Sequence, residues 1–334
     1  MSEKQRIRWG ILGCGRIAGK FAEDLALVPD AELTALGSSD LGKVQAFARR
    51  FPARHLHGSY RELASNPEVD VIYVATPHAM HHENTLLCLR HRKAVLCEKA
   101  FAINHRQASE MVATAREEKV FLMEALWTKF LPHYRTTMEM IASGRLGKVR
   151  SVLANFGFQP TDPVPDRLYN PALGGGTMLD IGIYNVFLAQ SVLGVPDGIS
   201  ASMTPSHTGV DAQCAVTFHY RDGAIAHLFS TFLSNLATDA DISGDAGRIR
   251  LTTRFYEPSA TVEYYKGTVD TRAVVPVEKR KGWGYLYEIE HVHECLRQGL
   301  TESPVMTHLD SLQLMQTLDR IRMAAGITYP ADGF

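Results

Sequence analysis

The chain has 334 residues, which is enough for two domains of ordinary size. Its composition, 45% hydrophobic and 21% charged, is typical of a globular protein with a full core and excludes a largely disordered chain. The net charge of -1 excludes a generally basic surface, so neither nucleic acid nor an anionic membrane is an expected partner.

The distribution of apolar residues and cysteines points to the cytoplasm. No uninterrupted apolar run reaches about 18 residues, so we expect no membrane-spanning helix. The short polar segment before residue 8 lacks the apolar stretch of a secretory signal. The cysteines are scattered without CxxC spacing, which favours reduced thiols. They are Cys14, Cys88, Cys97, Cys214 and Cys295.

Through residue 126, short apolar runs alternate with helical patterns. The predicted strands are 7–12, 32–36, 69–75, 94–97 and 120–123, and the predicted helices are 17–28, 41–50, 82–91 and 105–118. The dense β-branched run at 69–75 is typical of a central parallel strand covered on both faces. This alternation predicts an α/β domain over residues 1–126, a Rossmann-type doubly wound parallel sheet with right-handed crossovers.

After a crossing helix near 130–142, strand patterns follow one another with few helices between them. The predicted strands are 149–158, 212–220, 224–231, 248–253 and 261–265, and the predicted helices are 176–193, 287–298 and 309–325. They predict an α+β domain over residues 127–334 with a large, mostly antiparallel open sheet. The proline-rich stretch 159–171 reads as a long loop, which in compact enzymes is often functional.

A glycine loop, Gly13-x-Gly15-x-x-Ala18, joins the first predicted strand to the first helix. Gly13 permits a tight turn, Gly15 lets a pyrophosphate approach the backbone, and Ala18 allows close packing of the helix on the strand. Arg16 and Ile17 open the helix, whose N–H groups and dipole favour phosphate groups. The loop predicts dinucleotide binding. A glycine turn with a purely structural role is the alternative.

The end of the second strand bears on the choice of dinucleotide. An acidic residue usually grips the ribose of NAD there, but this chain has Ser38 and Ser39, with Lys43 one helical turn later. Hydroxyl and ammonium groups suit a 2′-phosphate, so we favour NADP. Asp40 either caps the following helix or serves NAD, and NAD therefore remains open.

Glu98 and Lys99 follow the predicted strand 94–97. Ligands bind at the carboxyl ends of parallel strands, where a lysine can lie beside a nicotinamide ribose and a substrate hydroxyl. Its charge would lower the pKa of a neighbouring acid. An ordinary surface ion pair is the alternative.

Asp180 and Tyr184 are four residues apart on the predicted helix 176–193 and so share one face. A phenol with an ordinary pKa near ~10 is a poor base at neutral pH, and a nearby ammonium group would bring it toward the working range. From spacing alone, a half-buried tyrosine that serves packing is the alternative.

These motifs together resemble those of the Gfo/Idh/MocA oxidoreductase family over essentially the whole chain. The matching segments are 13–18, 75–78 with His81, 97–99 and 174–184. Within the family the chain is most similar to the branch of dihydrodiol dehydrogenases and NADP-dependent D-xylose dehydrogenases, through segments 58–64, 94–99, 121–128 and 290–297. It departs from the family pattern at Ala100, where proline is usual, and at Ser39, where that branch often has arginine.

The resemblance implies roles for particular residues. The residues implied to contact the cofactor are Thr76, Pro77, His78, His81, Glu98 and Lys99, beside those of the glycine loop and the second strand. Tyr184 would be the acid–base residue with Lys99 as its partner, and Asp180 would bind substrate or orient Lys99. Trp127, Arg150 and Phe156 would line the substrate pocket. The open face of the second sheet would form a homodimer.

The predicted activity is therefore that of an NADP-dependent dehydrogenase acting on CH–OH groups. Hydride would pass between a sugar or cyclic diol hydroxyl and the nicotinamide. His78, His81 and His82 lie close together in the chain, but a metal site needs convergent ligands and none is expected. Two alternatives remain open: a reductase of a keto-sugar or other carbonyl, and a cofactor-binding sensor without catalysis.

Overall fold

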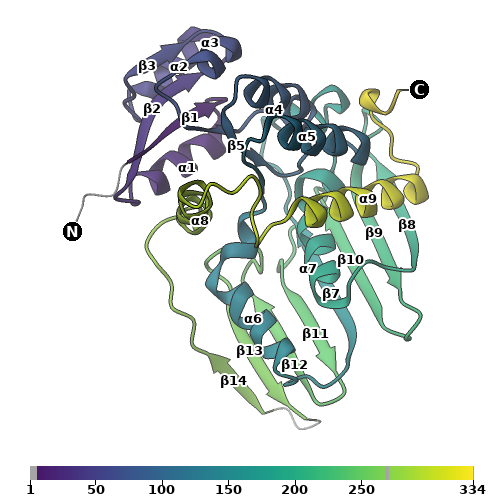
Figure 1. Cartoon of the computed structure of the whole chain (residues 1–334). Helices are drawn as coiled ribbons and strands as arrows, with labels where there is room; N and C mark the ends of the chain where they lie inside the picture. The colour runs from purple at the N-terminus through teal and green to yellow at the C-terminus, as the bar shows by residue number, and fades with distance from the viewer. Residues whose placement is uncertain (1–5, 268–270, 334) are drawn as a thin grey trace, which may run out of the picture. The chain divides into compact units, whose positions relative to one another are not determined.

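The structure, a computed structural model, describes residues 6–267 and 271–333 and divides the chain into two compact units. Unit 1 comprises Met1–Trp127 together with Arg280–Leu312, and unit 2 comprises Thr128–Lys279 together with Gln313–Phe334 (Figure 1). The chain changes unit next to the predicted boundary at residue 126. It changes again near residues 280 and 312, where the sequence predicted no boundary.

Unit 1 is built on a six-stranded parallel sheet with the order β3-β2-β1-β4-β5-β6. The strands are β1 (Ile7–Leu12), β2 (Ala31–Gly37), β3 (His55–His57), β4 (Val71–Val74), β5 (Ala94–Glu98) and β6 (Leu122–Ala125). The order reverses at β1, which has β2 on one side and β4 on the other. Doubly wound sheets bind ligands outside the carboxyl ends of the strands at such a reversal. The predicted Rossmann-type fold is confirmed.

The helices of unit 1 include every helix predicted before residue 126. They are α1 (Arg16–Leu25), α2 (Leu41–Ala48), α3 (Tyr60–Ser65), α4 (His81–Arg90), α5 (His105–Glu118) and α8 (Leu286–Arg297). Neither β3 nor α3 was predicted, because elements of three and six residues are too short to show a periodic pattern.

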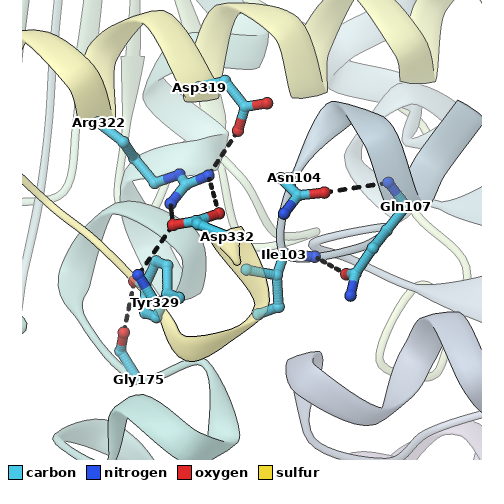
Figure 2. A network of polar contacts seen from close by, with 8 residues as sticks. All are labelled: Ile103, Asn104, Gln107, Gly175, Asp319, Arg322, Tyr329 and Asp332. Atoms are coloured by element: carbon cyan, nitrogen blue, oxygen red, sulfur yellow. Dashed lines mark hydrogen bonds and ion pairs between the residues drawn. The ribbon is translucent and has the colours of Figure 1, made fainter. Parts of the chain in front are cut away.

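The start of α5 shows how local sequence places a helix end. The Asn104 side chain accepts the backbone N–H of Gln107 at 3.0 Å, and the Gln107 side chain accepts the backbone N–H of Ile103 at 3.1 Å (Figure 2). The N–H of Gln107, which the helix leaves unpaired, and the N–H of Ile103 just before the helix are thus both satisfied by side chains.

Segment 280–312 belongs to unit 1 because α8 is anchored on α1. Asp24 of α1 is fully buried, and its carboxylate accepts four successive backbone N–H groups, from Trp283 to Leu286, at 2.7–3.2 Å. Farther along α8, Trp9 of β1 donates its indole N–H to His293 at 2.9 Å. These are contacts between residues far apart in the chain, which no local pattern reports.

Unit 2 is built on an eight-stranded sheet with the order β14-β13-β12-β11-β7-β10-β9-β8. The strands are β7 (Val149–Gly157), β8 (Gly198–Pro205), β9 (Asp211–His219), β10 (Ile225–Thr231), β11 (Ala240–Gly244), β12 (Gly247–Thr252), β13 (Thr261–Lys266) and β14 (Arg272–Val275). Neighbours pair antiparallel except β7 with β10. The predicted antiparallel sheet is confirmed, although β8, β11 and β14 had not been predicted.

Helices cover one face of this sheet. Helix α6 (Pro132–Ala142) packs on β13, and α7 (Ile183–Leu193) packs on β7 and β10 (Figure 1). Along β7 the side chains of Val152, Ala154 and Phe156 are buried on this covered face. On the opposite face Leu153 is 49% exposed, so the sheet has one covered side and one open side.

Helix α7 is the apolar helix at the centre of unit 2. By length and composition alone, the helical stretch Pro171–Leu193 qualifies as a candidate membrane span, although the sequence had predicted none. Its apolar window is 89% buried inside the protein, which is the behaviour of a core helix. Helix α9 (His308–Ala325) contributes its residues from Gln313 onward to unit 2.

Candidate functional site

The glycine loop lies at the carboxyl end of β1, beside the segment that follows β4. Gly13 has a φ of +100°, and a Cβ there would lie 2.7 Å from the carbonyl oxygen of Ala75, so only glycine fits. Gly15 is different, because it has an ordinary φ of -94° and nothing lies within 4 Å of where its Cβ would be. Packing within the protein therefore does not require a glycine at position 15, whereas the close approach of a ligand to the backbone does.

The start of α1 completes this cradle. The helix begins at Arg16, and no side chain caps its first N–H groups. Arg16 is exposed, Ile17 is half-buried, and Ala18 is fully buried against the strand. Uncapped N–H groups at the positive end of a helix dipole, next to an open glycine, fit the pyrophosphate of a dinucleotide.

The end of β2 shows what Asp40 does. Its carboxylate accepts the backbone N–H groups of Gly42 at 2.8 Å and Lys43 at 3.2 Å and so caps α2. Ser38 is buried, whereas Ser39 and Lys43 are exposed. The capping interpretation of Asp40 is confirmed, and a hydroxyl and an ammonium group remain exposed beside it.

The segment after β4 carries Thr76, Pro77, His78 and His81. Thr76 is buried and accepts a hydrogen bond from Asn84 at 3.2 Å, while Pro77 and His78 are half-buried at the start of the short helix η1 (His78–Met80). Thr76, Pro77 and His78 thus follow β4 directly, at the same edge of the sheet as the glycine loop.

His81 is the fully buried histidine of this segment. Its ring is fully buried, with Nδ1 2.8 Å from the carbonyl oxygen of Ala100 and Nε2 2.8 Å from that of Thr76. Burial lowers the pKa of His81 to about 4, whereas the two carbonyl oxygens act in the opposite direction. The ring of His81 thus joins the segments that follow β4 and β5, next to the residues predicted to contact the cofactor.

Strand β5 ends at Glu98, one residue beyond the predicted strand end, and Lys99 follows it. Glu98 is buried, and its carboxylate accepts the hydroxyl of Tyr73 and, at 3.1 Å, the backbone N–H of Lys99. Lys99 is half-buried, and the peptide bond between Lys99 and Ala100 is cis. The carboxylate thus fixes the backbone of the lysine at the end of the strand.

In unit 2 the predicted helix 176–193 contains two kinds of turn. Residues Met178–Gly182 form a π-helical turn, η5, which continues directly into α7. Asp180 lies in η5, and Tyr184 lies in the first turn of α7. Such π-helical insertions occur frequently at functional sites.

The side chains around Asp180 and Tyr184 form a compact cluster. Asp180 is 9% exposed and pairs with Arg167 at 3.2 Å. The ring of Tyr184 lies 4.8 Å from that of Tyr256 and 5.9 Å from that of Phe156, and the Phe156 and Tyr256 rings stack at 4.4 Å. The structure thus packs Tyr184 with Phe156 and Tyr256, and the Asp180 carboxylate lies near enough to Tyr256 to interact with it electrostatically.

Two members of this cluster had not been predicted. Arg167 lies in the loop 159–171, whose conformation no sequence pattern determines. Tyr256 lies between β12 and β13, and its backbone carbonyl accepts the hydroxyl of Thr128 at 2.8 Å. Neither residue belongs to a motif, so the sequence contained no signal for them beyond the prediction that the long loop is functional.

Two further pocket residues had been predicted, Arg150 and Trp127. Arg150 begins β7, is paired with Asp245 at 3.2 Å on the surface, and lies six residues from Phe156 along an extended strand, roughly 20 Å away. The structure does not bring Arg150 to the cluster. Trp127 belongs to unit 1, where it is buried and stacks on Tyr285 at 4.7 Å.

Lys99 and the glycine loop lie in unit 1, and Asp180 and Tyr184 lie in unit 2. Among residues 6–267 and 271–333, no group of three or more His, Cys, Asp or Glu side chains is arranged to hold a metal ion. His82, for example, pairs with Glu110 at 2.9 Å.

Comparison with known proteins agrees with this division. Residues 7–126 match the profile described as the oxidoreductase family with an NAD-binding Rossmann fold. Residues 134–250 match the profile of the GFO/IDH/MocA C-terminal domain.

Similar proteins are known over the whole length of the chain. The trans-1,2-dihydrobenzene-1,2-diol dehydrogenases of Sus scrofa and Homo sapiens are each 37% identical, over 98% of this chain and 99% of their own. The 3-ketoreductase of Actinomadura kijaniata, solved with NADP and TDP-benzene, is 27% identical with a TM-score of 0.86, over 96% of this chain and 98% of its own.

The aldose-aldose oxidoreductase of Caulobacter crescentus, solved with glycerol, shares the fold, with a TM-score of 0.87 at 24% identity over 96% of this chain and 98% of its own. Both domain profiles and the full-length relatives identify the same group of proteins. The chain belongs to the Gfo/Idh/MocA family of NAD(P)-binding oxidoreductases.

Proposed function

We propose that this protein is an NADP-dependent dehydrogenase that oxidises a CH–OH group of a cyclic diol or a sugar. The observation that carries the proposal is the cluster in unit 2, where Tyr184 and the paired carboxylate of Asp180 lie beside the stacked rings of Phe156 and Tyr256. Aromatic faces suit the ring of a cyclic substrate, and the carboxylate suits its hydroxyl groups. Relatives named as dihydrodiol dehydrogenases support the same substrate class.

Four side chains of the protein have separate roles in this reaction. The bound nicotinamide supplies the acceptor for hydride. Tyr184 takes the proton of the reacting hydroxyl, and the ammonium group of Lys99 stabilises the negative charge that develops on oxygen. Asp180 accepts a hydrogen bond from a second substrate hydroxyl, and Arg167 holds that carboxylate in place.

NADP as the preferred dinucleotide is supported at the end of β2. Asp40 is engaged as the cap of α2, while Ser39 and Lys43 are exposed there. A hydroxyl and an ammonium group suit a 2′-phosphate, whereas a ribose of NAD is normally held by a carboxylate. The 3-ketoreductase that shares the fold was solved with NADP.

We further propose that the protein works as a cytoplasmic homodimer. The five cysteines are free thiols, as favoured by a reducing compartment. On the open face of the second sheet, a shallow hollow over β7 to β10 is lined by uncharged side chains, among them Leu153, Ala215 and Phe229. Cores of protein interfaces are depleted in charged residues, so a second copy of the chain fits this face.

The experiment that tests the mechanism is a double-mutant cycle with Lys99→Met and Tyr184→Phe. Each substitution should lower kcat by about 100-fold or more with either trans-1,2-dihydrobenzene-1,2-diol or D-xylose, while the affinity for NADPH, measured by fluorescence, is nearly kept. Because both groups act in one step, the double variant should be little slower than the single ones. Undiminished turnover in Tyr184→Phe would exclude the proposed role of the tyrosine.

The reverse reaction is the second candidate, favoured by the 3-ketoreductase among the similar structures. The same residues would then protonate a carbonyl oxygen as hydride arrives. Initial rates measured in both directions with NADPH and NADP⁺ decide between them, and binding of NADPH without turnover in either direction would indicate a sensor.

A further inference from the structure

The π-helical turn η5 is held at its start by a buried carboxylate. Asp211, the first residue of β9, is fully buried, and its Oδ2 accepts the hydroxyl of Thr177 at 2.6 Å and the backbone N–H of Met178 at 2.7 Å. Ser230 of β10 donates to the same threonine hydroxyl at 3.1 Å. Two strands of the sheet therefore fix the first residues of the turn.

The three residues that precede Thr177 and η5 are glycines, so no side chain of their own fixes their position. They are Gly174, Gly175 and Gly176, and the first and third have φ angles of +75° and +111°. A Cβ at Gly176 would lie 2.3 Å from Asp211 Oδ1 and 3.0 Å from the hydroxyl oxygen of Tyr329. Gly176 is required by this close approach. The segment is placed by its contacts with neighbouring segments, which include hydrogen bonds from the backbone N–H groups of Gly175 and Gly176 to the carbonyl oxygens of Asn170 and Leu168.

The C-terminal turn Tyr329–Asp332 contacts this glycine segment. The hydroxyl of Tyr329, which is 4% exposed, donates to the carbonyl oxygen of Gly175 at 2.6 Å (Figure 2). The backbone N–H of Tyr329 donates to the carboxylate of Asp332 at 2.9 Å, which closes the turn. The Tyr329 ring thus projects from a short turn that is closed by its own hydrogen bond.

Arg322 of α9 fixes this turn to the helix. Its guanidinium group donates to both carboxylate oxygens of Asp332, at 2.8 and 3.2 Å, and to Asp319 at 2.7 Å (Figure 2). Arg322 is 4% exposed, and its guanidinium carbon lies 5.2 Å from the centre of the Tyr329 ring. A buried bidentate ion pair of this kind fixes the relative orientation of its two side chains more strictly than a single charge contact does.

We propose that the C-terminal turn Tyr329–Asp332 positions the acid–base tyrosine, with Tyr329 as the positioning residue. The chain of contacts runs from Arg322 through Asp332 and Tyr329 to Gly175, and from there along η5 to Tyr184. The proposal rests on the catalytic role proposed for Tyr184, and it adds a remote residue on which that role depends. A displacement of about 1 Å at a reacting group can lower a rate by as much as 100-fold.

The experiment compares Tyr329→Phe with a matched variant at the other end of the same helix. Tyr220 donates its hydroxyl to the carbonyl oxygen of Gly194, the residue that ends α7, at 3.0 Å. Tyr220→Phe therefore removes the same kind of bond from the end of α7 that is remote from Tyr184. Both variants keep the aromatic ring and lose one hydrogen bond to a glycine carbonyl.

Turnover is measured with NADP⁺ and trans-1,2-dihydrobenzene-1,2-diol or D-xylose. Tyr329→Phe should lower kcat by about tenfold or more, with the affinity for NADPH unchanged, and Tyr220→Phe should not. The isotope effect of substrate deuterated at the reacting carbon should rise in Tyr329→Phe, because the chemical step becomes slower. A mere loss of folded protein would lower kcat without changing this isotope effect or the pH profile.

Hydrogen exchange followed by mass spectrometry gives a readout that needs no turnover. Peptides that cover 174–184 should exchange faster in Tyr329→Phe and should be unchanged in Tyr220→Phe. If Tyr329→Phe does not fold, Arg322→Lys, which keeps the charge but loses the bidentate pair, should show the same changes in weaker form.

The outcomes separate this inference from the function on which it rests. If Tyr184→Phe is inactive but Tyr329→Phe has the same kcat and isotope effect as Tyr220→Phe, the positioning role alone is overturned. A Tyr184→Phe variant with full turnover overturns the proposed acid–base role, and the positioning of a catalytic tyrosine with it. A Tyr329→Phe loss that follows the folded fraction, with an unchanged isotope effect, also overturns the inference.

Discussion

Two buried ionisable residues of unit 2 respond to pH in opposite directions. Burial raises the pKa of Asp211 to about 6 from its ordinary value of 3.8, although hydrogen bonds from Thr177 and Met178 oppose the shift. Burial lowers the pKa of His133 to about 4, and its ring contacts the carbonyl oxygen of Phe255 at 2.8 Å. The folded protein thus binds a proton at Asp211 more tightly, and one at His133 less tightly, than the unfolded chain does.

The prediction at this scale concerns stability between about pH 4 and pH 6. Because the pKa of Asp211 is higher in the folded state, its protonation stabilises the folded state. This contribution is complete at pH values below the ordinary pKa of 3.8 and is lost as the pH rises through about 6. Relative to Asp211→Asn, the wild type should lose about 3 kcal/mol over this interval, measured by urea unfolding at a series of pH values. Parallel curves for the two proteins would contradict the shift.

Taking the difference between the two proteins removes the contribution of His133, which has the opposite sign and is common to both. The stability that His133 contributes as a neutral ring rises with pH from about 4 toward its ordinary value.

At the level of elements, the two glycines of the loop between β1 and α1 differ in why a glycine is needed, although the sequence motif treats them alike. Gly13 is needed by the fold, because its φ of +100° and its contact with Ala75 leave no space for a side chain. Gly15 has open space and an ordinary φ, so only the approach of a ligand requires it. The same loop therefore contains one glycine that the fold requires and one that we propose serves binding.

Alanine substitutions should distinguish these two glycines. Gly13→Ala should lower the free energy of unfolding by at least about 2 kcal/mol, because the backbone is strained and the Cβ meets a carbonyl oxygen. Gly15→Ala should unfold like the wild type but bind NADPH about tenfold more weakly or worse. Thermal unfolding and NADPH fluorescence measure the two effects, and a Gly15→Ala variant with full affinity would exclude a close approach of the pyrophosphate at this position.

At the scale of the whole molecule, the two units carry different parts of the proposed reaction. Unit 1 carries the glycine loop, Ser39, Lys43 and Lys99, and unit 2 carries Asp180 and Tyr184. Unit 2 also carries the open sheet face on which we propose that a second copy of the chain docks.

Charge placed on this open face should separate the proposed dimer. Leu153 lies in the middle of β7 and is 49% exposed, so Leu153→Asp should leave the fold intact and give a monomer by light scattering. Met323→Asp is the matched control, because Met323 is 78% exposed on α9 and lies outside the sheet. A wild-type protein with the mass of a single chain would refute the dimer directly.

The sequence by itself determined the α/β unit, the antiparallel sheet, the glycine loop, the place of Lys99 after a strand, and the place of Asp180 and Tyr184 in one helical stretch. Apolar periodicity and glycine spacing are local properties, and such properties survive in a linear pattern. Short elements such as β3 and α3 carry too little of that pattern to be recognised. Burial of the His81 ring and the surface position of Arg150 likewise appear only in the folded chain.

The tertiary structure alone decided which distant residues meet. The anchoring of α8 by Asp24, the packing of Tyr256 against Tyr184, and the hydrogen bond from Tyr329 to Gly175 join residues separated by long stretches of chain. No periodicity connects such residues, because their contact depends on how sheets and helices pack rather than on spacing along the sequence. For the same physical reason, the residues proposed to react were found from motifs, and the residue proposed to position them was found only from the fold.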